Sequence, residues 1–456
     1  MRMLSLLFLA ALGAATITIH DSSDFADLTA DAADDALTAD WDYTPTTYQV
    51  EAIVGAYEYS DQTDTIAHET LTVSANDTSV LVITKGSDVN VSYSTIVKYG
   101  YSSDLYQSSF FGLNAAVNVA NESVAYLDHV NVTVHNGAAN VYSYGNNTYV
   151  SISDSSLYSS GPVSHGLYAA GYGTIVGRNL EHYSGAYRSS SFAGDSPQGY
   201  VYVYDSVAHT AGIGSAIIYG QGTVYAENIV GYAEQAPIAF LDTAQIDIYD
   251  SDLTAGLLAG AVVFSSGTRG SGSEINLTNS RLTVLPEAAA ALWFGNVIAS
   301  SHLASTAINT TSGILVIANH SQVTQDFSYF ADSTASAEAT VTVSASDLAG
   351  DLVAYNGSSI SWSLTDYSSW TGTAYSGYGT ATFAVSLDAT STWTLTNDTV
   401  LNNFTDSDTT LGNVYSAGYT LYYDSSAAAN RWLNGTTKQL TGGGSVTPAT
   451  TAQLRR

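Results

Sequence analysis

Short segments in which apolar and polar residues alternate recur along the middle of the chain. Six such segments, each ending in Asp or Asn, are 150–154, 175–179, 201–205, 224–228, 246–250 and 275–279. Their first residues are 22 to 29 positions apart. Alternation by two indicates a strand with one buried face, and a repeat of about two dozen residues is typical of one coil of a solenoid. We therefore predict an all-β fold, a right-handed parallel β-helix with coils of about 22–29 residues.

Weaker copies extend the repeat in both directions. The segment 124–128 precedes the six, and the segments 341–345, 360–364 and 393–397 follow them. Each coil also has a second apolar patch after a turn rich in Gly or Ala, and we expect these patches to form a second sheet. The patches are 139–144, 166–169, 215–219, 237–241, 261–264 and 292–294. The β-helix is thus predicted to span residues 60–440.

Within each unit, the first and third residues should point inward and stack on their equivalents in the neighbouring coils, about 4.8 Å away. The fifth position falls where the strand has to bend. Asp and Asn tolerate turn conformations and can bond their own backbone, so we interpret this column as a turn ladder rather than a catalytic or metal-binding row. Its predicted members are Asp128, Asp154, Asn179, Asp205, Asn228, Asp250, Asn279 and Asn397.

Composition excludes several classes of protein. The 456 residues include 11 Lys and Arg against 41 Asp and Glu, which gives a net charge of −30. Such a chain has little to neutralise a phosphate backbone or an anionic headgroup, so we expect no nucleic-acid partner. The absence of Cys excludes disulfides and zinc-thiolate sites, and we predict no metal site and no cofactor. A hydrophobic content of 45% is enough for a large core, and we expect a monomer.

The first residues are typical of a secretory signal. Met-Arg-Met precedes the apolar run 4–12 and the small residues 13–15, so we predict a signal peptide at 1–15. An acidic segment, 16–59, follows, and it is a solvated leader or propeptide rather than a calcium loop, because it lacks the fixed spacing of oxygen ligands. We further predict a flexible polar tail at 441–456. With no second long apolar run, the expected protein is secreted, extracellular and without a transmembrane anchor.

Sequons for N-glycosylation are frequent. The acceptor residues are Asn76, Asn90, Asn121, Asn131, Asn146, Asn276, Asn309, Asn319, Asn356, Asn397, Asn403 and Asn434. In a secreted eukaryotic protein such sites receive glycans, so we expect a glycoprotein if the source is eukaryotic.

Three segments carry a resemblance to a known group. The segments 109–117 (SFFGLNAAV), 164–168 (SHGLY) and 214–219 (GSAIIY) resemble those of uncharacterised secreted right-handed β-helix proteins of filamentous fungi and bacteria, with a fold like that of pectin lyase. The later segments 259–269, 292–299 and 352–376 look like the fungal branch. The resemblance implies the fold over about residues 60–440, but it carries no catalytic residues.

Pectin-active enzymes have the same shape, but their chemistry is missing from this chain. The paired Asp with a flanking Asp, the His-Gly and the Arg-x-Lys of polygalacturonases do not occur together. We expect His165, in the fragment Ser-His-Gly, to be a turn residue or a satisfied polar residue. Polyuronate lyases need a cationic base and cationic subsites, and a net charge of −30 would repel a polyanion.

Outward positions of three successive coils place Tyr beside acids. They are the second and fourth positions of the units, which should lie together on one wall, and we name these six residues the tyrosine wall: Tyr202, Tyr204, Tyr225, Glu227, Asp247 and Tyr249. Aromatic rings and carboxylates are suited to a neutral polysaccharide or cell-wall glycan. Tyr is also common at exposed strand positions in any sheet, which is the plainer interpretation.

Two classes of function remain. The favoured one is a non-catalytic extracellular β-helix that acts as a cell-wall-associated, adhesive or carbohydrate-contacting surface. The alternative is a polysaccharide-active hydrolase or lyase that uses acids on one wall. For that alternative the predicted catalytic pair is Glu227 and Asp247, whose Cβ atoms should be roughly 8 Å apart on neighbouring strands. This separation is within the range of about 6.5–9.5 Å found between the carboxyl groups of inverting glycosidases.

Overall fold

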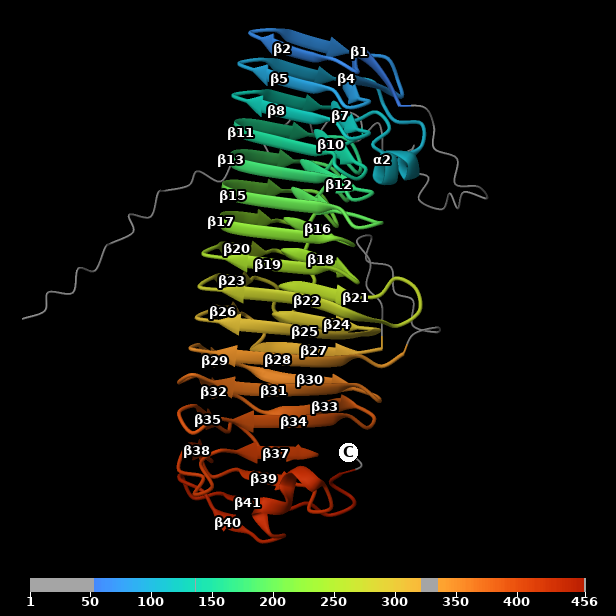
Figure 1. Cartoon of the computed structure of the whole chain (residues 1–456). Helices are drawn as coiled ribbons and strands as arrows, with labels where there is room; N and C mark the ends of the chain where they lie inside the picture. The colour runs from blue at the N-terminus through green and yellow to red at the C-terminus, as the bar shows by residue number, and fades with distance from the viewer. Residues whose placement is uncertain (1–52, 136, 321–334, 455–456) are drawn as a thin grey trace, which may run out of the picture.

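The computed structural model describes residues 53–135, 137–320 and 335–454. The chain forms a parallel β-helix of about 15 turns stacked along one axis, with only 3% helix (Figure 1). The predicted all-β solenoid is therefore confirmed. The predicted signal peptide and residues 16–52 of the acidic segment lie outside the described residues.

A sheet of 13 parallel strands, sheet A, runs along the solenoid from residue 54 to residue 378. The predicted second apolar patches fall in or next to its strands, as expected. In spatial order the strands are β1 (Val54–Ser60), β4 (Thr78–Thr84), β7 (Val117–Ala120), β10 (Val141–Tyr144), β12 (Leu167–Ala170), β14 (Phe192–Gly194), β16 (Ile218–Gly220), β18 (Ala239–Asp242), β21 (Ala261–Phe264), β24 (Leu292–Gly295), β27 (Ile314–Asn319), β30 (Asp351–Tyr355) and β33 (Ala374–Tyr378).

A second parallel sheet, sheet B, turns a corner in most of its coils. In four coils one long strand runs through the corner: β11 (Tyr149–Ser159), β13 (Thr174–Ser184), β15 (Tyr200–Thr210) and β17 (Thr223–Ala233). In other coils the corner separates two strands: β2 (Thr63–Ala67) and β3 (Thr70–Val73), β5 (Asp88–Ser92) and β6 (Thr95–Lys98), β8 (Val124–Asp128) and β9 (Asn131–Val134), β19 (Gln245–Tyr249) and β20 (Asp252–Ala255), β22 (Gly270–Thr278) and β23 (Arg281–Val284), β25 (Val297–Ala304) and β26 (Ala307–Thr310). Sheet B ends with β28 (Glu338–Ser344), β31 (Ser359–Thr365), β34 (Thr382–Leu387) and β37 (Asn403–Asp406).

Two small sheets complete the C-terminal coils. One contains β29 (Asp347–Ala349), β32 (Ser369–Thr371), β35 (Thr392–Thr394) and β38 (Val414–Tyr415). The other contains β36 (Thr399–Leu401), β39 (Thr420–Tyr423), β41 (Ser445–Pro448) and β40 (Lys438–Gln439), with the 3₁₀ helix η2 (Ala428–Leu433) nearby. The short helix α2 (Leu105–Phe111) lies beside sheet A, and the left-handed Gly112 ends it, with φ 74°.

The six predicted repeat units pair in the predicted register. Val150 pairs with Ile175, and the row continues through Val201, Val224, Ile246 and Ile275. The inward residues of these coils are almost all fully buried, among them Val203, Ile248 and Leu277. Each coil therefore adds one layer to a continuous apolar core.

One inward position in the N-terminal coils holds a cation instead of an apolar side chain. Lys98 is fully buried and pairs with Val73 and Val134 in the neighbouring coils. Its ammonium group donates to the carbonyl oxygens of Ala75, at 2.9 Å, and Gly100, at 2.6 Å. Burial lowers the pKa of Lys98 to about 8, because the interior disfavours the charged form. The two carbonyl groups offset part of that cost.

The predicted turn ladder is present at the corner of sheet B. Its members from coil to coil are Asp154, Asn179, Asp205, Asn228, Asp250 and Asn279, with φ angles of 49° to 56°. Asn and Asp adopt this left-handed conformation more readily than other non-glycine residues. Hydrogen bonds also join successive members in pairs: the amide of Asn179 donates to Asp154 at 2.6 Å, that of Asn228 to Asp205 at 2.6 Å, and that of Asn279 to Asp250.

Three details of the predicted repeat are wrong. Asp128 is not the corner residue of its coil, because Tyr149 pairs with Val124 and the copy 124–128 is one residue out of register. The left-handed residue there is His129, with φ 50°. The copy 360–364 is two residues out of register, since Trp362 pairs with Val341. Asn397 follows β35, outside sheet B, so it does not belong to the ladder.

The solenoid also extends past both ends of the predicted range 60–440. At the N-terminal end β1 begins at Val54 and pairs with β4. At the other end β41 pairs in parallel with β39, although it lies inside the predicted flexible tail 441–456. Backbone pairing with the preceding coil orders this part of the tail despite its polar composition.

The facing of β19 can be tested with two neighbouring substitutions. Ile248→Asp would place an unpaired charge between two coils and should lower the free energy of unfolding by several kcal/mol, because Ile248 is fully buried. Tyr249→Ser, at an outward position, should lower it far less. Chemical denaturation of both variants, beside the parent protein, gives the comparison. An equal loss of unfolding free energy in both variants would mean that Ile248 does not face the core.

Candidate functional site

The tyrosine wall forms as predicted on the outer surface of sheet B. Tyr202 pairs with Tyr225, which pairs with Asp247 in the next coil. In the parallel row, Tyr204 pairs with Glu227, and Glu227 pairs with Tyr249. All six side chains are half-buried. The diagonal placement of Glu227 and Asp247 on neighbouring strands is thus the predicted one.

The rings of the wall stack on one another along the solenoid axis. The centroids of Tyr225 and Tyr249 are 5.1 Å apart with 29° between the ring planes, and those of Tyr204 and Tyr225 are 5.6 Å apart. The guanidinium of Arg178 lies 4.0 Å above the ring of Tyr204. Because neighbouring groups cover part of each ring face, the wall offers a ligand mainly ring edges and hydroxyl groups.

Both carboxylates of the wall accept hydrogen bonds from neutral donors. The hydroxyl of Tyr225 donates to Oε2 of Glu227 at 2.8 Å. Asp247 accepts from the amides of Gln245 and Asn276, each at 2.9 Å. These contacts fix the two acids as acceptors on a regular strand surface.

The sequon asparagines all lie at the surface, and none of the twelve is buried. Ten are exposed, and the two half-buried ones, Asn276 and Asn319, are engaged in hydrogen bonds. Asn276 donates to Asp247 of the tyrosine wall, and Oδ1 of Asn319 accepts from the indole of Trp293 at 3.1 Å. A glycan is attached at Nδ2, so at Asn276 it would remove one of the two hydrogen bonds that this amide donates, to Asp247 and Glu274. The bond that Asn319 accepts through Oδ1 does not involve the glycosylated nitrogen.

A buried polar cluster that the sequence did not predict lies on the outer face of sheet A. Tyr142 and Tyr168 occupy neighbouring outward positions of β10 and β12, yet both are fully buried. The hydroxyl of Tyr142 donates to the carbonyl of Ser109 in α2, at 2.9 Å. The hydroxyl of Tyr168 donates to the carboxylate of Asp195. Burial raises the pKa of Asp195 to about 6.

The polar cluster continues into the next coils. Gln221 donates to the hydroxyl of Tyr219 at 3.1 Å and to Asp242 at 3.3 Å, and burial raises the pKa of Asp242. On the other side, Nδ1 of His165 accepts from the backbone N–H of Ser190 at 3.0 Å. Burial lowers the pKa of His165 to about 3, so its ring is neutral at physiological pH. His165 is thus a satisfied polar residue, as expected.

No pattern in the sequence predicts this cluster. Outward positions of a solenoid strand are expected to face solvent, but here α2 and the inter-strand turns cover them. Asp195 follows β14 in a turn and stands in no repeated motif. With exposed fractions of 2% and 6%, Asp195 and Asp242 are too buried to reach a polymeric substrate. Their contacts identify them as structural acids that hold the turns on sheet A.

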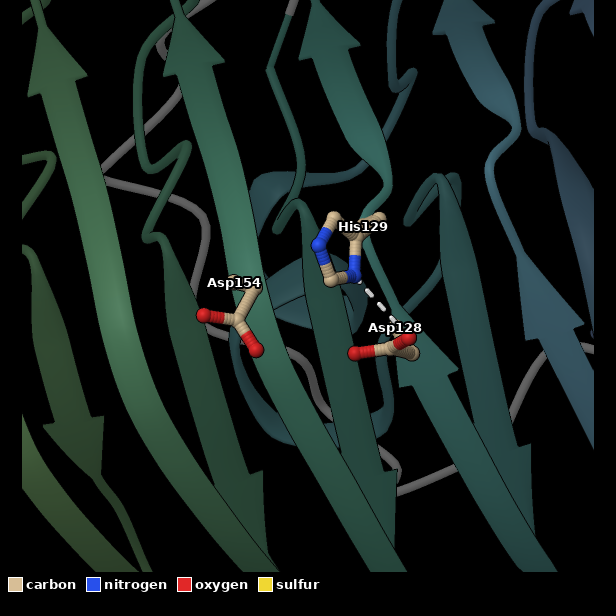
Figure 2. Close-up of side chains that lie close together, drawn as sticks. All are labelled: Asp128, His129 and Asp154. Carbon is tan, nitrogen blue, oxygen red and sulfur yellow. Dashed lines mark hydrogen bonds and ion pairs between the residues drawn. The ribbon is translucent and has the colours of Figure 1, made fainter.

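A different group of side chains offers atoms suited to a metal ion. Asp128, His129 and Asp154 lie at the corner of sheet B, where β8 and β11 bend (Figure 2). One ligand atom from each of the three lies within 4.8 Å of the others. The sequence could have predicted this group. If the inward residues Ala125 and Leu127 are aligned with Val150 and Ile152 of the next coil, His129 falls opposite Asp154.

Comparison with known proteins identifies no relative: no protein-family model, curated protein or solved structure matches the chain. Among the described residues, no helix is long and apolar enough to cross a membrane.

The buried acid Asp195 should make stability depend on pH. Its pKa in the folded state is about 6, against 3.8 for the free side chain, so the folded state retains the proton over that interval. The contribution of Asp195 to stability should therefore be greatest below about pH 4 and fall by up to about 3 kcal/mol as the pH rises through 6. Unfolding free energies of the parent protein and Asp195→Asn, measured across this interval, give the difference. A pH-independent difference would show that Asp195 is not buried in this way.

Proposed function

We propose that the protein is a secreted, glycosylated β-helix that acts as a cell-wall-associated or adhesive surface and contacts neutral carbohydrate through the tyrosine wall. The observation that carries the proposal is the in-register array of Tyr202, Tyr204, Tyr225 and Tyr249 beside Glu227 and Asp247 on an accessible sheet. Hydroxyl and carboxylate groups can exchange hydrogen bonds with sugar hydroxyls, and the remaining ring surface supplies apolar contact.

Charge restricts the class of glycan. With a net charge of −30, the chain repels polyuronates and other polyanions, whereas a neutral polysaccharide meets no such barrier. Arg178, which lies over Tyr204, is the cation that contacts the wall in the described part of the chain. A neutral polysaccharide is therefore the ligand class that we propose.

Secretion and glycosylation rest on separate features. Residues 1–15 have the order of a signal peptide, and the surface position of all twelve sequon asparagines supports their modification in a eukaryotic secretory pathway. Glycans on the outer faces would leave the core untouched, because the inward columns contain none of the acceptor residues.

Hydrolysis of a glycan remains the second candidate, on the strength of one observation. The register places Glu227 and Asp247 diagonally on neighbouring strands, as an inverting glycosidase would require. Both acids already accept hydrogen bonds from neutral side chains on regular strands, which favours binding over catalysis.

A glycan-binding comparison tests the proposed function. The purified mature protein should bind at least one neutral polysaccharide on an array, and the double variant Tyr225→Ser with Tyr249→Ser should bind it about tenfold more weakly. Tyr415→Ser is the matched control, because Tyr415 is exposed on β38, away from the wall. Binding that is unchanged in the double variant, or reduced equally in the control, would refute a role for the wall.

The same preparation separates binding from hydrolysis. Release of reducing sugar from the bound polysaccharide would show that the protein is an enzyme rather than a surface protein, provided that Glu227→Gln abolishes the release and retains binding.

Glycosylation can be tested on the protein secreted by a eukaryotic host. Enzymatic removal of N-glycans should lower its molecular mass. No change in mass would contradict the glycosylation part of the proposal.

A further inference from the structure

The corner of sheet B brings nitrogen and oxygen ligands together on two successive coils. Strand β8 ends at Asp128, and the following His129 takes the left-handed corner conformation. Asp154 takes the same conformation in the next coil, with φ 49°. Parallel pairing of β8 with β11 and a hydrogen bond from the backbone N–H of His129 to the carbonyl of Ser153, at 3.1 Å, fix the two corners relative to each other.

Each carboxylate of this group has one oxygen held by a neutral donor. The hydroxyl of Ser153 donates to Oδ1 of Asp128 at 2.9 Å, and the amide of Asn179 donates to Oδ1 of Asp154 at 2.6 Å. Oδ2 of Asp128 lies 2.9 Å from Nδ1 of His129, and Oδ2 of Asp154 is left for a ligand. Such outer contacts are what orients carboxylate ligands in metal sites.

The imidazole is held by stacking as well. The ring of Tyr93 lies against that of His129, with centroids 4.8 Å apart, and His68 stacks on the far side of Tyr93 at 5.3 Å. Figure 2 shows the imidazole standing between the two carboxylates, with one ring nitrogen bonded to Asp128 and the other facing away from it. The three side chains are also open to solvent, so an ion can enter without any rearrangement of the backbone.

Other corners of the ladder lack this combination. Asp205 faces Asn228 and Asp250 faces Asn279, so each carboxylate meets an amide that can only donate to it. Asp154 also accepts from an amide, that of Asn179, but on its other side it has the imidazole of His129, and an imidazole nitrogen is a metal ligand. The imidazole therefore distinguishes this corner from the otherwise similar corners of the ladder.

We propose that Asp128, His129 and Asp154 form a binding site for a divalent transition-metal ion of the Zn²⁺ class. One imidazole and two carboxylates match the ligand types of Zn²⁺, whereas Ca²⁺ requires six to eight oxygen ligands, about twice what this corner supplies. Ligand atoms of a tetrahedral zinc site lie about 3.3 Å apart, so small side-chain rotations close the group around an ion.

The wider electrostatics agree with a cation site. A net charge of −30 raises the local concentration of divalent cations around the chain. Three protein ligands leave a fourth position for water or for a group of a bound partner. The site thus departs from the metal-free protein that the sequence predicted.

Isothermal titration of the chelator-stripped mature protein with Zn²⁺ tests the proposal. The parent protein should bind one equivalent that His129→Ala and Asp154→Asn each lose, while Asn179→Ala should bind it about tenfold more weakly, because Asn179 only orients Asp154. Titration with Co²⁺ supplies a second readout, since a tetrahedral site gives a visible absorption band that the His129→Ala protein should lack.

His302→Ala is the matched control, because His302 is exposed in sheet B and its ring contacts Ser344 rather than an acid. This variant should retain the equivalent, and circular dichroism should show that all variants fold like the parent. No binding by the parent protein, or equal binding by the parent and His129→Ala, would overturn the proposal, since the ion would then be absent or adventitious.

Discussion

Parallel hydrogen bonding between successive coils is the constraint on which the rest of the structure depends. Each strand of a coil pairs in register with a strand about two dozen residues away, so every side chain stacks on its equivalents in the coils before and after it. A one-residue slip would move inward residues such as Ile248 to the surface. Burial of the inward residues stabilises that register, and the order of the outward residues follows from it.

The same register explains why like side chains form rows. On the wall, Tyr225 stacks with Tyr249, and at the corner Asn amides reach Asp carboxylates of the preceding coil. Within the C-terminal core, Trp370 and Trp393 stack at 4.7 Å. Stacking along the axis also affects the proposed function. It covers ring faces that a sugar would otherwise use, so the proposed carbohydrate contact would depend more on hydroxyl and carboxylate groups than on ring faces.

How much of this could be predicted from the sequence differs between the fold and the sites. The alternating residues of 201–205 and 224–228 were enough to predict the register of these strands, their inward and outward faces, and the neighbours of Glu227. A period-two pattern can be recognised from the local sequence alone. The offset at 124–128 arose because both Val124 and Ala125 start an acceptable alternation, and only pairing with β11 distinguishes them. The cluster around Asp195 depends on turns and α2 folding over sheet A, a long-range arrangement that no repeat position encodes.

Disulfide formation between introduced cysteines tests the register most directly, because the natural chain contains no Cys. The double variant Tyr225→Cys with Asp247→Cys places two thiols at directly paired outward positions, within the span of a disulfide. In Tyr225→Cys with Tyr249→Cys the thiols lie on the diagonal, about 8 Å apart between Cα atoms, which is too far to bridge. With the observed register, the first pair should oxidise rapidly and the second should keep free thiols; the reverse result would show that this register is wrong.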